Sequence, residues 1–340
     1  MAALHGTRKT QEFMTSSRAR SVPLGGIVFQ SVPGFEDHLE KELEILSSNV
    51  PCNIERWGPL FYLCSPPPSP LPVFWHLNTW LNPVKIEFET ISEAAKALRD
   101  IQRNWSPVLF TQFRRGSLIA SKLPPVSQKK RPFPWLLPQA SMGAWTLLDA
   151  CAMIASPSCS SPFPSGTIEF GEDREGPPGR AYLKLWETFT RLGRMPEKGE
   201  RCLDAGASPG AWTWALSRLG ADVIAVDRAP LDKRAASMPG VSFIRHDAFT
   251  IRPEEIGPID WLFSDVICYP SRLFQWIEKW LECGLCKNFV CTIKMQGSVE
   301  SGVDFDTPRR FAAIPGSRVL RLYHNKHELT WIKVSSPACP

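Results

Sequence analysis

Short apolar runs alternate with stretches of helical periodicity over the second half of the chain, from residue 178 onward. Five of the runs have the length and composition of strands: 201–206, 222–227, 241–246, 259–264 and 288–293. Apolar residues recur at helical spacing between several of these strands, as in 211–219 and 271–283. Strands that alternate with helices in this way predict an α/β fold, in which helices cover a parallel sheet.

Two more strands are predicted after this alternation, at 318–323 and 328–334. The turn signal between them is the short pair Asn325 and Lys326. So short a turn predicts an antiparallel hairpin at the edge of the sheet. We therefore expect a seven-stranded sheet in a domain that spans 178–336.

The first part of the chain has the pattern of a smaller α+β domain. Strands are predicted at 27–32, 57–64 and 84–88. Apolar residues at helical spacing predict a helix after the first strand: Phe35, Leu39, Leu43 and Leu46. Ser92 is a suitable N-cap for a second helix that runs to about Asn104. We assign 25–122 to this domain.

Prolines divide the two predicted domains. The chain has 32 prolines, which cluster at 66–72, 124–138 and 157–178. Proline fixes φ and lacks an N–H, so such clusters disfavour helix and strand interiors. We assign 123–177 to a Pro-rich connecting region, and the basic residues 1–24 to a disordered tail.

Charge adds one candidate for a partner. The chain carries a net charge of +5, which is compatible with RNA. Residues 101–148 contain seven basic residues and no acidic residue, and aromatic residues are interleaved among them. Cations neutralise phosphates and aromatic faces stack on bases, so this stretch is predicted either to bind RNA or to be a solvated linker with ordinary core aromatics. The basic residues are Arg103, Arg114, Arg115, Lys122, Lys129, Lys130 and Arg131.

Several classes of protein are disfavoured. No apolar run reaches the roughly 18 residues that a membrane span needs. The first 21 residues have no apolar segment typical of a secretory signal, and we expect a cytoplasmic protein. Among ten cysteines, Cys283 and Cys286 form the one C-x-x-C pair, and no second pair completes a zinc site. We expect no metal.

A glycine-containing loop follows the strand at 201–206. Gly206 and Gly210 let the backbone turn sharply at the carboxyl end of a strand, where open α/β sheets bind ligands, and Pro209 suits a first helical turn. The spacing differs from G-x-G-x-x-G, and the carboxylate of Asp204 beside the loop suits a cationic ligand better than a diphosphate. Asp227 and Asp247 end the next two strands, placed for ribose hydroxyls and an adenine edge. The candidate cofactor-binding residues are Asp204, Gly206, Ser208, Pro209, Gly210, Trp212, Asp227, Asp247 and Asp265.

Four charged residues are expected to converge at the same edge of the sheet. Asp265 and Lys294 follow the apolar cores of the fourth and fifth strands. Lys184 lies on a predicted helix upstream, and Glu328 opens the last strand. Two lysines and two acids at one cleft predict acid–base chemistry rather than four separate surface charges.

These motifs resemble the FtsJ-type 2′-O-ribose methyltransferases, over residues 179–334. The loop Asp-Ala-Gly-Ala-Ser-Pro-Gly-Ala-Trp-Thr matches the family's cofactor motif, except that Ala211 stands where the family often has a second glycine. Within the family, the chain is most similar to bacterial enzymes that methylate a cytidine ribose of 23S ribosomal RNA. The residues Leu322-Tyr323-His324 and the segment 32–36 (Val-Pro-Gly-Phe-Glu) carry this narrower resemblance. The family's Lys-Asp-Lys-Glu tetrad corresponds to Lys184, Asp265, Lys294 and Glu328.

The resemblance implies an S-adenosyl-L-methionine-dependent enzyme that methylates RNA, with a THUMP-like N-terminal domain that helps bind the RNA. It also implies that Lys294 takes the proton of the ribose hydroxyl. The short segment 296–306 is expected to line the substrate cleft, which leaves the identity of the substrate open. The alternatives are a transfer or messenger RNA substrate, a non-catalytic RNA-binding protein that retains the fold, and a nicotinamide-dependent oxidoreductase, which the loop spacing disfavours.

Overall fold

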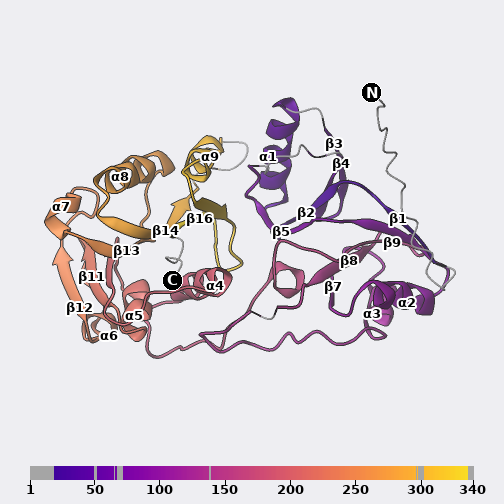
Figure 1. Ribbon diagram of the computed structural model, residues 1–340, viewed down its shortest axis with the longest axis horizontal. Coiled ribbons are helices and arrows are strands. Elements are labelled where there is room, and N and C mark those ends of the chain that lie inside the picture. The colour runs from indigo at the N-terminus through magenta and orange to yellow at the C-terminus, as the bar shows by residue number, and fades with distance from the viewer. Residues whose placement is uncertain are drawn as a thin grey trace, which may run out of the picture.

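The computed structural model describes residues 19–49, 52–64, 66, 72–137, 139–295, 297 and 302–335. Figure 1 shows an N-terminal part in indigo and purple beside a C-terminal part in orange and yellow. Most of the expected disordered tail at 1–24 lies outside the described residues, and within it Arg20–Pro23 form strand β1. In the parts of the chain that the structure describes, no helix is long and apolar enough to cross a membrane.

The C-terminal part contains a seven-stranded sheet in the order β12-β11-β10-β13-β14-β16-β15. The strands from β10 to β14 are parallel, while β16 pairs antiparallel with both β14 and β15. This confirms the predicted α/β fold and places the antiparallel pair at the edge. The bounds are β10 Arg201–Ala205, β11 Asp222–Asp227, β12 Val241–Arg245, β13 Ile259–Ser264, β14 Cys286–Lys294, β15 Ser317–Leu320 and β16 Glu328–Lys333.

Helices cover both faces of this sheet (Figure 1). One face packs against α4 Tyr182–Leu192, α5 Ala211–Arg218 and α6 Lys233–Ala236. The other packs against α7 Pro253–Ile256, α8 Pro270–Cys283 and α9 Asp306–Ala312. Strands buried on both faces need apolar side chains at successive positions, so β13 reads Trp261-Leu262-Phe263 without alternation. Leu262 packs on the α8 side, and Trp261 and Phe263 pack on the α4 side.

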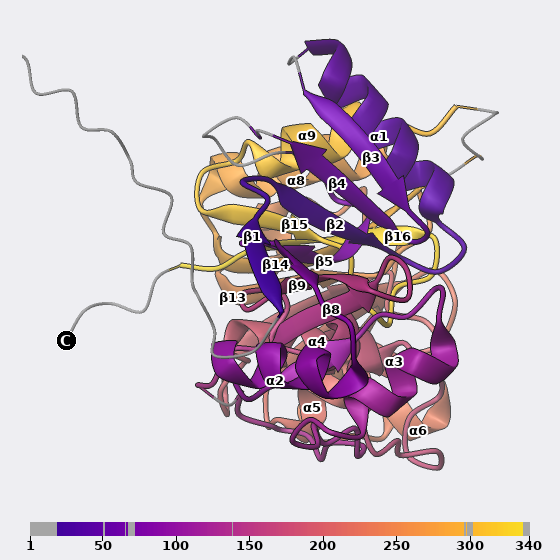
Figure 2. The ribbon, with the colours of Figure 1, turned by 90° about the vertical axis from the view of Figure 1, so that its right-hand side faces the viewer.

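The N-terminal part contains two sheets that pack face to face. A four-stranded sheet has the order β3-β4-β2-β5 and carries α1 Glu36–Asn49. A five-stranded sheet has the order β1-β6-β9-β8-β7 and is covered by α2 Ile91–Ile101 and α3 Phe113–Ala120, as Figure 2 shows from the side. The remaining bounds are β2 Ile27–Ser31, β3 Asn53–Trp57, β4 Leu60–Cys64, β5 His76–Trp80, β6 Val84–Glu87, β7 Trp105–Pro107, β8 Gly143–Leu147, β9 Ala152–Ser156 and the 3₁₀ turn η1 Pro164–Gly166.

Three expectations for this part were wrong in detail. The strand predicted at 57–64 contains β4 and the turn at Gly58, whose φ is +57°, and the rest of the hairpin, β3, precedes it. The cap of α2 is Thr90, whose side chain accepts from the N–H of Glu93 in a capping box, and not Ser92. Strands β8 and β9 lie in the expected connecting region 123–177. The sequence did not predict them because each is short and its pairing includes a strand distant in sequence.

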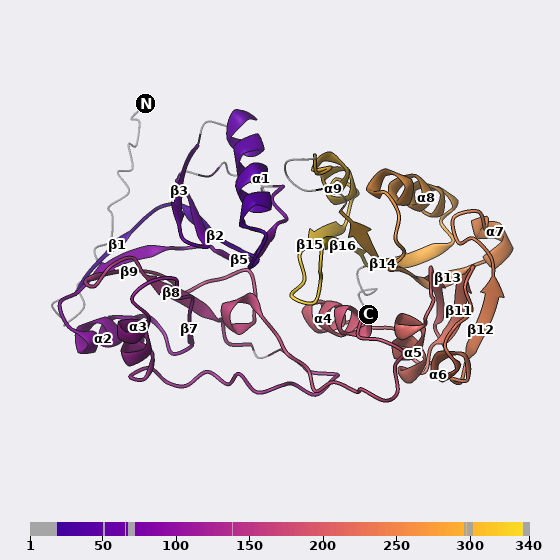
Figure 3. The same cartoon turned by 180° about the vertical axis from the view of Figure 1, so that it is seen from behind.

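The rest of that region connects the two parts twice. After α3 the chain runs toward the C-terminal part and then returns to β8 (Figure 3). On the way, Phe133 stacks on Trp186 of α4, with 4.7 Å between the ring centres. It later passes Phe170 on its way to α4, and a bridge between Arg131 and Phe170 joins the two passes. These aromatic residues pack into the same core as α4, so the connecting region contributes to the C-terminal core.

Candidate active site

Four charged side chains form a ring at one edge of the seven-stranded sheet. Lys184 Nζ lies 2.9 Å from Asp265 Oδ2 and 2.5 Å from Glu328 Oε1. Lys294 Nζ lies 2.5 Å from Asp265 Oδ1 and 2.9 Å from Glu328 Oε2. Each lysine therefore contacts both acids, and the two positive and two negative charges alternate around the ring.

The topology explains why residues so distant in sequence meet. Asp265 follows β13 and Lys294 ends β14, and parallel neighbours place their carboxyl ends at the same edge. Because β16 runs antiparallel to β14, its first residue lies at that edge too, and Glu328 is the direct register partner of Lys294. Lys184 reaches the ring from α4, and the Thr292 hydroxyl donates to Asp265 Oδ1 at 2.6 Å.

The ring shifts the pKa of two of its members. Burial alone would raise the pKa of Glu328, but Lys184 and Lys294 outweigh it and hold that pKa at about 2. Burial alone would lower the pKa of Lys294, but the charges of Asp265 and Glu328 outweigh it and raise that pKa above its ordinary value. In the free protein Lys294 is therefore a protonated amine held by two carboxylates.

The ring lies at a cleft of about 930 Å³. Pro209 and Ala211 of the glycine loop line the cleft, together with Ile267, whose side chain is exposed. The connection between β15 and β16 forms another wall with Tyr323, His324, Lys326 and His327. A small reacting group could thus touch both the loop and the charged ring.

The glycine loop has the tight geometry that its sequence predicts. Gly206 has a φ of +79° and Gly210 a φ of +109°, a region that favours glycine. A Cβ on Gly206 would lie 2.6 Å from Val266, and one on Gly210 would lie 2.5 Å from Ala235. Helix α5 begins at Ala211, so Pro209 precedes the helix instead of forming its first turn.

Two comparisons with known proteins bear on this site. Residues 178–301 match the family model described as FtsJ-like methyltransferase, a stretch that contains Lys184, Asp265 and Lys294 and ends before Glu328. The C-terminal domain of this chain is an FtsJ-like methyltransferase domain. The order of its seven strands and the placement of its glycine loop agree with this assignment.

Curated relatives share the name ribosomal RNA large subunit methyltransferase M. The protein from Azoarcus sp. is 32% identical over 165 residues, which is 45% of each chain. The protein from Laribacter hongkongensis is 30% identical over 198 residues, 54% of this chain and 55% of the relative. The protein from Xanthomonas axonopodis pv. citri is 29% identical over 249 residues, 70% of this chain and 68% of the relative. The chain spans about half the length of the first two.

Two of the expected cofactor ligands lie inside the FtsJ-like domain instead of at the cleft. Asp204 is 1% exposed and accepts from the Thr213 hydroxyl at 2.6 Å, and burial raises its pKa to about 7. Trp212 is buried, and its indole N–H donates to the Ala181 carbonyl at 2.9 Å. Both residues lie between the sheet and the first turn of α5, so they stabilise the glycine loop from its buried side.

Two further expected cofactor residues, Asp227 and Asp247, lie at strand ends. Asp227 accepts from the backbone N–H of Ser208 at 3.0 Å, so it also holds the glycine loop. Asp247 accepts from Arg228 at 2.9 Å and lies 3.6 Å from Arg272. These acids end β11 and follow β12, beside the loop but not on the wall of the cleft that the charged ring lines.

Sequence reasoning missed Glu187, which lies one turn after Lys184 on α4. Its side chain is fully buried and accepts from the backbone N–H groups of Tyr323 and His324 and from His324 Nδ1 at 2.8 Å. Burial would raise its pKa, but Arg191 and His324 outweigh it and lower the pKa to about 2. Glu187 lies on the same side of the helix as Lys184 and Arg191, so the sequence pattern gave no signal that its side chain is buried.

Glu187 explains why the expected tight hairpin was wrong. Strand β15 ends at Leu320 and β16 begins at Glu328, so residues 321–327 form a loop, which we name the clamp loop. Glu187 fixes its middle, and Arg321 donates from its guanidinium to the carbonyl groups of Leu322 and Lys326. The polar side chains that contact this loop therefore include Glu187 from α4 and Arg321 from the loop itself.

The basic stretch divides into two kinds of residue. Lys129 and Lys130 are exposed, whereas Arg131 lies 4.7 Å over the ring of Trp135. Phe133 packs against Trp186, and Phe110 packs against Gly58, so both rings are partly buried against other parts of the protein. Phe113 is exposed.

The cysteine pair shows no sign of a metal site. Burial raises the pKa of the Cys286 thiol, and Cys283 and Cys286 each donate to a backbone carbonyl. Among the described residues, no group of three or more His, Cys, Asp or Glu side chains is placed to hold a metal ion. Of the expected cleft segment 296–306, residues 296 and 298–301 lie outside the described part.

Proposed function

We propose that this protein is an S-adenosyl-L-methionine-dependent 2′-O-ribose methyltransferase of RNA, and that its substrate is a cytidine of the large ribosomal subunit RNA. The observation that carries the proposal is the ring of Lys184, Asp265, Lys294 and Glu328 beside a glycine loop in an FtsJ-like domain. The chemistry rests on the ring, and the large ribosomal RNA rests on the names of the relatives. The cytidine rests on the sequence resemblance of residues 322–324 and 32–36.

The residues around the glycine loop suit a cationic, ribose-containing cofactor. Gly206 and Gly210 let the loop turn tightly against Val266 and Ala235, which keeps it close to the carboxyl end of β10, where a ligand would bind. Asp227 has acceptor capacity beyond its bonds to Ser208 and Ala229, because each carboxylate oxygen has two lone pairs. Asp227 would bind the ribose hydroxyls, and Asp247 the adenine edge. When bound, the cofactor supplies an electrophilic methyl group.

The protein's own task is to remove a proton from a poor nucleophile. A ribose hydroxyl attacks as its proton leaves, and Lys294 can take that proton only as a neutral amine. Asp265 and Glu328 fix the position of Lys294 Nζ, and Thr292 fixes Asp265. Lys184 shares both acids and so offsets part of their attraction for a proton on Lys294.

The raised pKa of Lys294 in the free protein gives this mechanism a pH dependence. Below the pKa, the neutral fraction of Lys294 grows about tenfold for each pH unit, so the single-turnover rate should rise with pH. The pKa of Lys294 would fall when a cationic sulfonium lies nearby, because like charges disfavour the protonated amine. In the pH–rate profile of the cofactor-bound enzyme, the rate should therefore begin to rise at a pH below the pKa of Lys294 in the free protein.

The N-terminal part is proposed to help bind the RNA, as a THUMP-like domain would. Lys129 and Lys130 are exposed cations on the connection that links this part to the FtsJ-like domain. Cations there would contact phosphates and add affinity without reading sequence. The choice of nucleotide would then depend on the shape of the RNA and on the cleft walls.

The test is methylation of defined RNAs by the purified full chain with tritiated cofactor. Transcripts of 23S ribosomal RNA, transfer RNA and a messenger RNA are compared, and 2′-O-methyl groups are mapped to single nucleotides. The proposal expects one cytidine ribose in the 23S transcript to be labelled. Label only in transfer or messenger RNA would overturn the substrate, and label on a base would overturn the chemistry.

A further inference from the structure

The N-terminal part touches the active site of the FtsJ-like domain through one cluster of rings. His38 of α1 and His327 of the clamp loop share a hydrogen bond between their Nε2 atoms at 3.1 Å. Phe35 lies 5.6 Å from His327, and Trp75 lies 4.5 Å from His38, ring centre to ring centre. Arg321 lies 5.1 Å over Phe35. We name these five side chains the ring cluster.

Local sequence explains how the N-terminal part presents its rings. The N–H of Phe35 donates to the Val32 carbonyl at 2.9 Å, which closes a turn over Pro33 and Gly34. Gly34 has a φ of +80° and open space around its Cβ position, so glycine is needed there for its conformation. The turn points Phe35 toward the clamp loop and starts α1 at Glu36. This accounts for the segment 32–36, to which the catalytic site gives no role.

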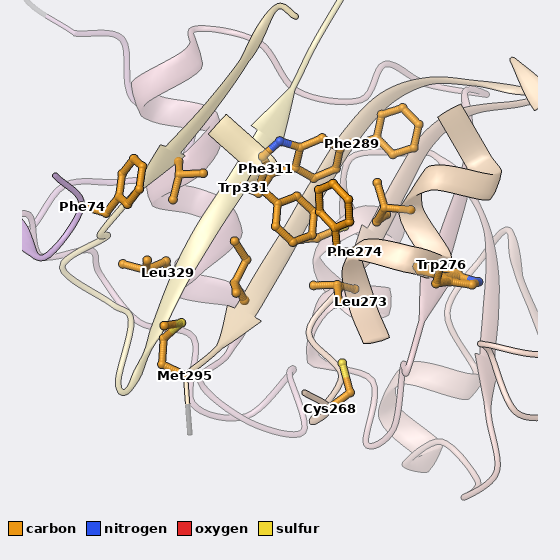
Figure 4. Packing of buried hydrophobic residues seen from close by; sticks show 14 of the residues in the cluster. Phe74, Cys268, Leu273, Phe274, Trp276, Phe289, Met295, Phe311, Leu329 and Trp331 are labelled. Carbon is orange, nitrogen blue, oxygen red and sulfur yellow. The ribbon is translucent and has the colours of Figure 1, made fainter. Parts of the chain in front are cut away.

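The other partner, Trp75, is held by a buried acid. Glu42 of α1 accepts from the backbone N–H groups of Phe74 and Trp75 at 2.8 and 3.0 Å. Trp75 itself is fully buried, and Phe74 packs in the same apolar cluster as Met295 and Leu329 of the FtsJ-like domain (Figure 4). The N-terminal part thus meets this domain across a packed core and not through surface charges.

In the FtsJ-like domain, the ring cluster adjoins the four charged residues of the active site. His327 immediately precedes Glu328, which contacts both lysines. The His327 carbonyl accepts from the N–H of Met295, the residue after Lys294, at 3.1 Å. A displacement of His327 therefore moves the backbone next to both Glu328 and Lys294.

We propose that His38 is a positioning residue for methyl transfer: by bonding His327 across the domain boundary, it holds Glu328 and Lys294 in the geometry of the charged ring. The catalytic site is then complete only when the N-terminal part is docked on the clamp loop. This inference rests on the proposed function for its kinetic consequence, but its structural consequence is independent of it.

The hydrogen bond between two imidazoles gives the interlock a pH dependence. One ring donates and the other accepts, so the bond persists while at least one ring is neutral. When both rings are protonated, two donors face each other and the bond is lost. Burial lowers the pKa of His38 and of His327. The charged groups that face the pair are Asp37 on α1 and Arg321 and Glu328 in the FtsJ-like domain. Because both pKa values are lowered, the interlock is intact above the ordinary histidine pKa and weakens as the pH falls below it.

The test compares His38→Phe with His38→Gln in the full chain. Phenylalanine keeps a ring beside Trp75 but has no nitrogen, whereas the glutamine amide reaches the position of Nε2 and can bond His327. Glu44→Gln is the matched control, because Glu44 lies on the exposed face of the same helix and pairs only with Lys41. His327→Phe makes the same test from the other domain.

The first measurement is amide hydrogen exchange of peptides covering 321–328, without cofactor or RNA. His38→Phe should raise exchange there, while His38→Gln and Glu44→Gln should leave it near the wild-type level. The second is the rate of methyl transfer to a 23S transcript. His38→Phe should lower kcat roughly tenfold or more with little change in KM, because misplacement by a fraction of an ångström is enough to slow a positioned reaction. His38→Gln should restore most of kcat, and its rate should keep only the loss at acid pH that the protonation of Lys294 causes.

The outcomes separate this inference from the proposed function. Unchanged exchange in His38→Phe and in His327→Phe overturns the inference, whatever the enzyme methylates. Unchanged kcat in an active enzyme overturns it as well. A wild-type protein that methylates no RNA overturns the proposed function, and the exchange measurement then still decides whether His38 holds the clamp loop.

Discussion

Glu42 in the N-terminal part and Glu328 in the FtsJ-like domain are both buried carboxyl groups, yet their pKa values shift in opposite directions. Burial raises the pKa of Glu42 to about 7, since its bonds to two backbone N–H groups only partly oppose the loss of water. At Glu328 the two lysines outweigh burial and hold the pKa at about 2. The difference teaches that partners, and not burial, decide whether a buried acid keeps its charge.

The same distinction separates structural from chemical acids within the FtsJ-like domain. Asp204 has only a hydroxyl partner in Thr213, and its pKa rises to about 7, as for Glu42. Glu187 has Arg191 and His324, and its pKa falls to about 2. Asp204 and Glu42, whose partners are hydroxyl or backbone groups, therefore have raised pKa values, whereas Glu187 and Glu328, whose partners are cations, have lowered ones.

The largest expected effect removes a cation from the charged ring. Lys294→Ala should lower the rate of methyl transfer by about 10²–10⁴-fold while cofactor binding, measured by calorimetry, persists. Lys294→Arg should not rescue the rate, because a guanidinium stays protonated. Lys287→Ala is the control, since Lys287 lies on the same strand in an exposed pair with Asp260. Near-normal turnover of Lys294→Ala would show that the charged ring does not supply the general base.

The next test sets the two acids directly against each other. Glu328→Gln leaves two buried lysines with one acid, and breaking a buried pair costs about 3–5 kcal/mol of unfolding free energy. Glu42→Gln keeps an oxygen for Phe74 and Trp75 and removes only a charge that burial disfavours. Chemical denaturation at pH 8 should therefore destabilise the first variant and leave the second as stable as the wild type or more so.

The pH dependence sharpens this test. The folded pKa of Glu42, about 7, exceeds the ordinary value of 4.5, so its contribution to stability is full below pH 4.5 and is lost as the pH rises through 7. That loss is on the order of 3 kcal/mol. Glu42→Gln should remove this part of the pH dependence, measured by denaturation from pH 4 to 8. An unchanged slope would show that Glu42 is ionised throughout, and the contrast with Glu328 would then fail.

A smaller effect is expected at the cofactor side of the cleft. Asp227→Ala removes the acceptor that we propose for the ribose hydroxyls, which also accepts from the Ser208 N–H, and should weaken cofactor binding by about 1–3 kcal/mol. Asp227→Asn keeps one acceptor oxygen and should lose less. Equal affinity of wild type and Asp227→Ala in calorimetry would mean that the cofactor's ribose binds elsewhere.

The smallest expected effect lies on the N-terminal side. Lys129→Glu with Lys130→Glu should weaken RNA binding and reduce the slope of log affinity against log salt by about 2, roughly one unit for each lost phosphate contact. Arg131 is left in place because it packs on Trp135. Lys279→Glu, at an exposed position of α8, serves as the control. An unchanged salt dependence would show that Lys129 and Lys130 belong to a solvated linker and do not contact RNA phosphates.

The sequence by itself determined the FtsJ-like sheet almost completely, because parallel strands buried on both faces leave continuous apolar runs. The predicted strands at 222–227 and 259–264 coincide with β11 and β13. The meeting of Lys184, Asp265, Lys294 and Glu328 was also predictable, since strand ends at one edge follow from the topology.

Only the tertiary structure decided the parts that depend on pairing between distant segments. Strands β8 and β9 are short runs among prolines, and they are strands because β6 and β7 lie beside them. The clamp loop is not a tight turn because Glu187, on another element, binds its backbone. The contact between His38 and His327 joins residues 289 positions apart. Local pattern carries no information about such partners, because the free energy that fixes them is released only when the separate elements pack together.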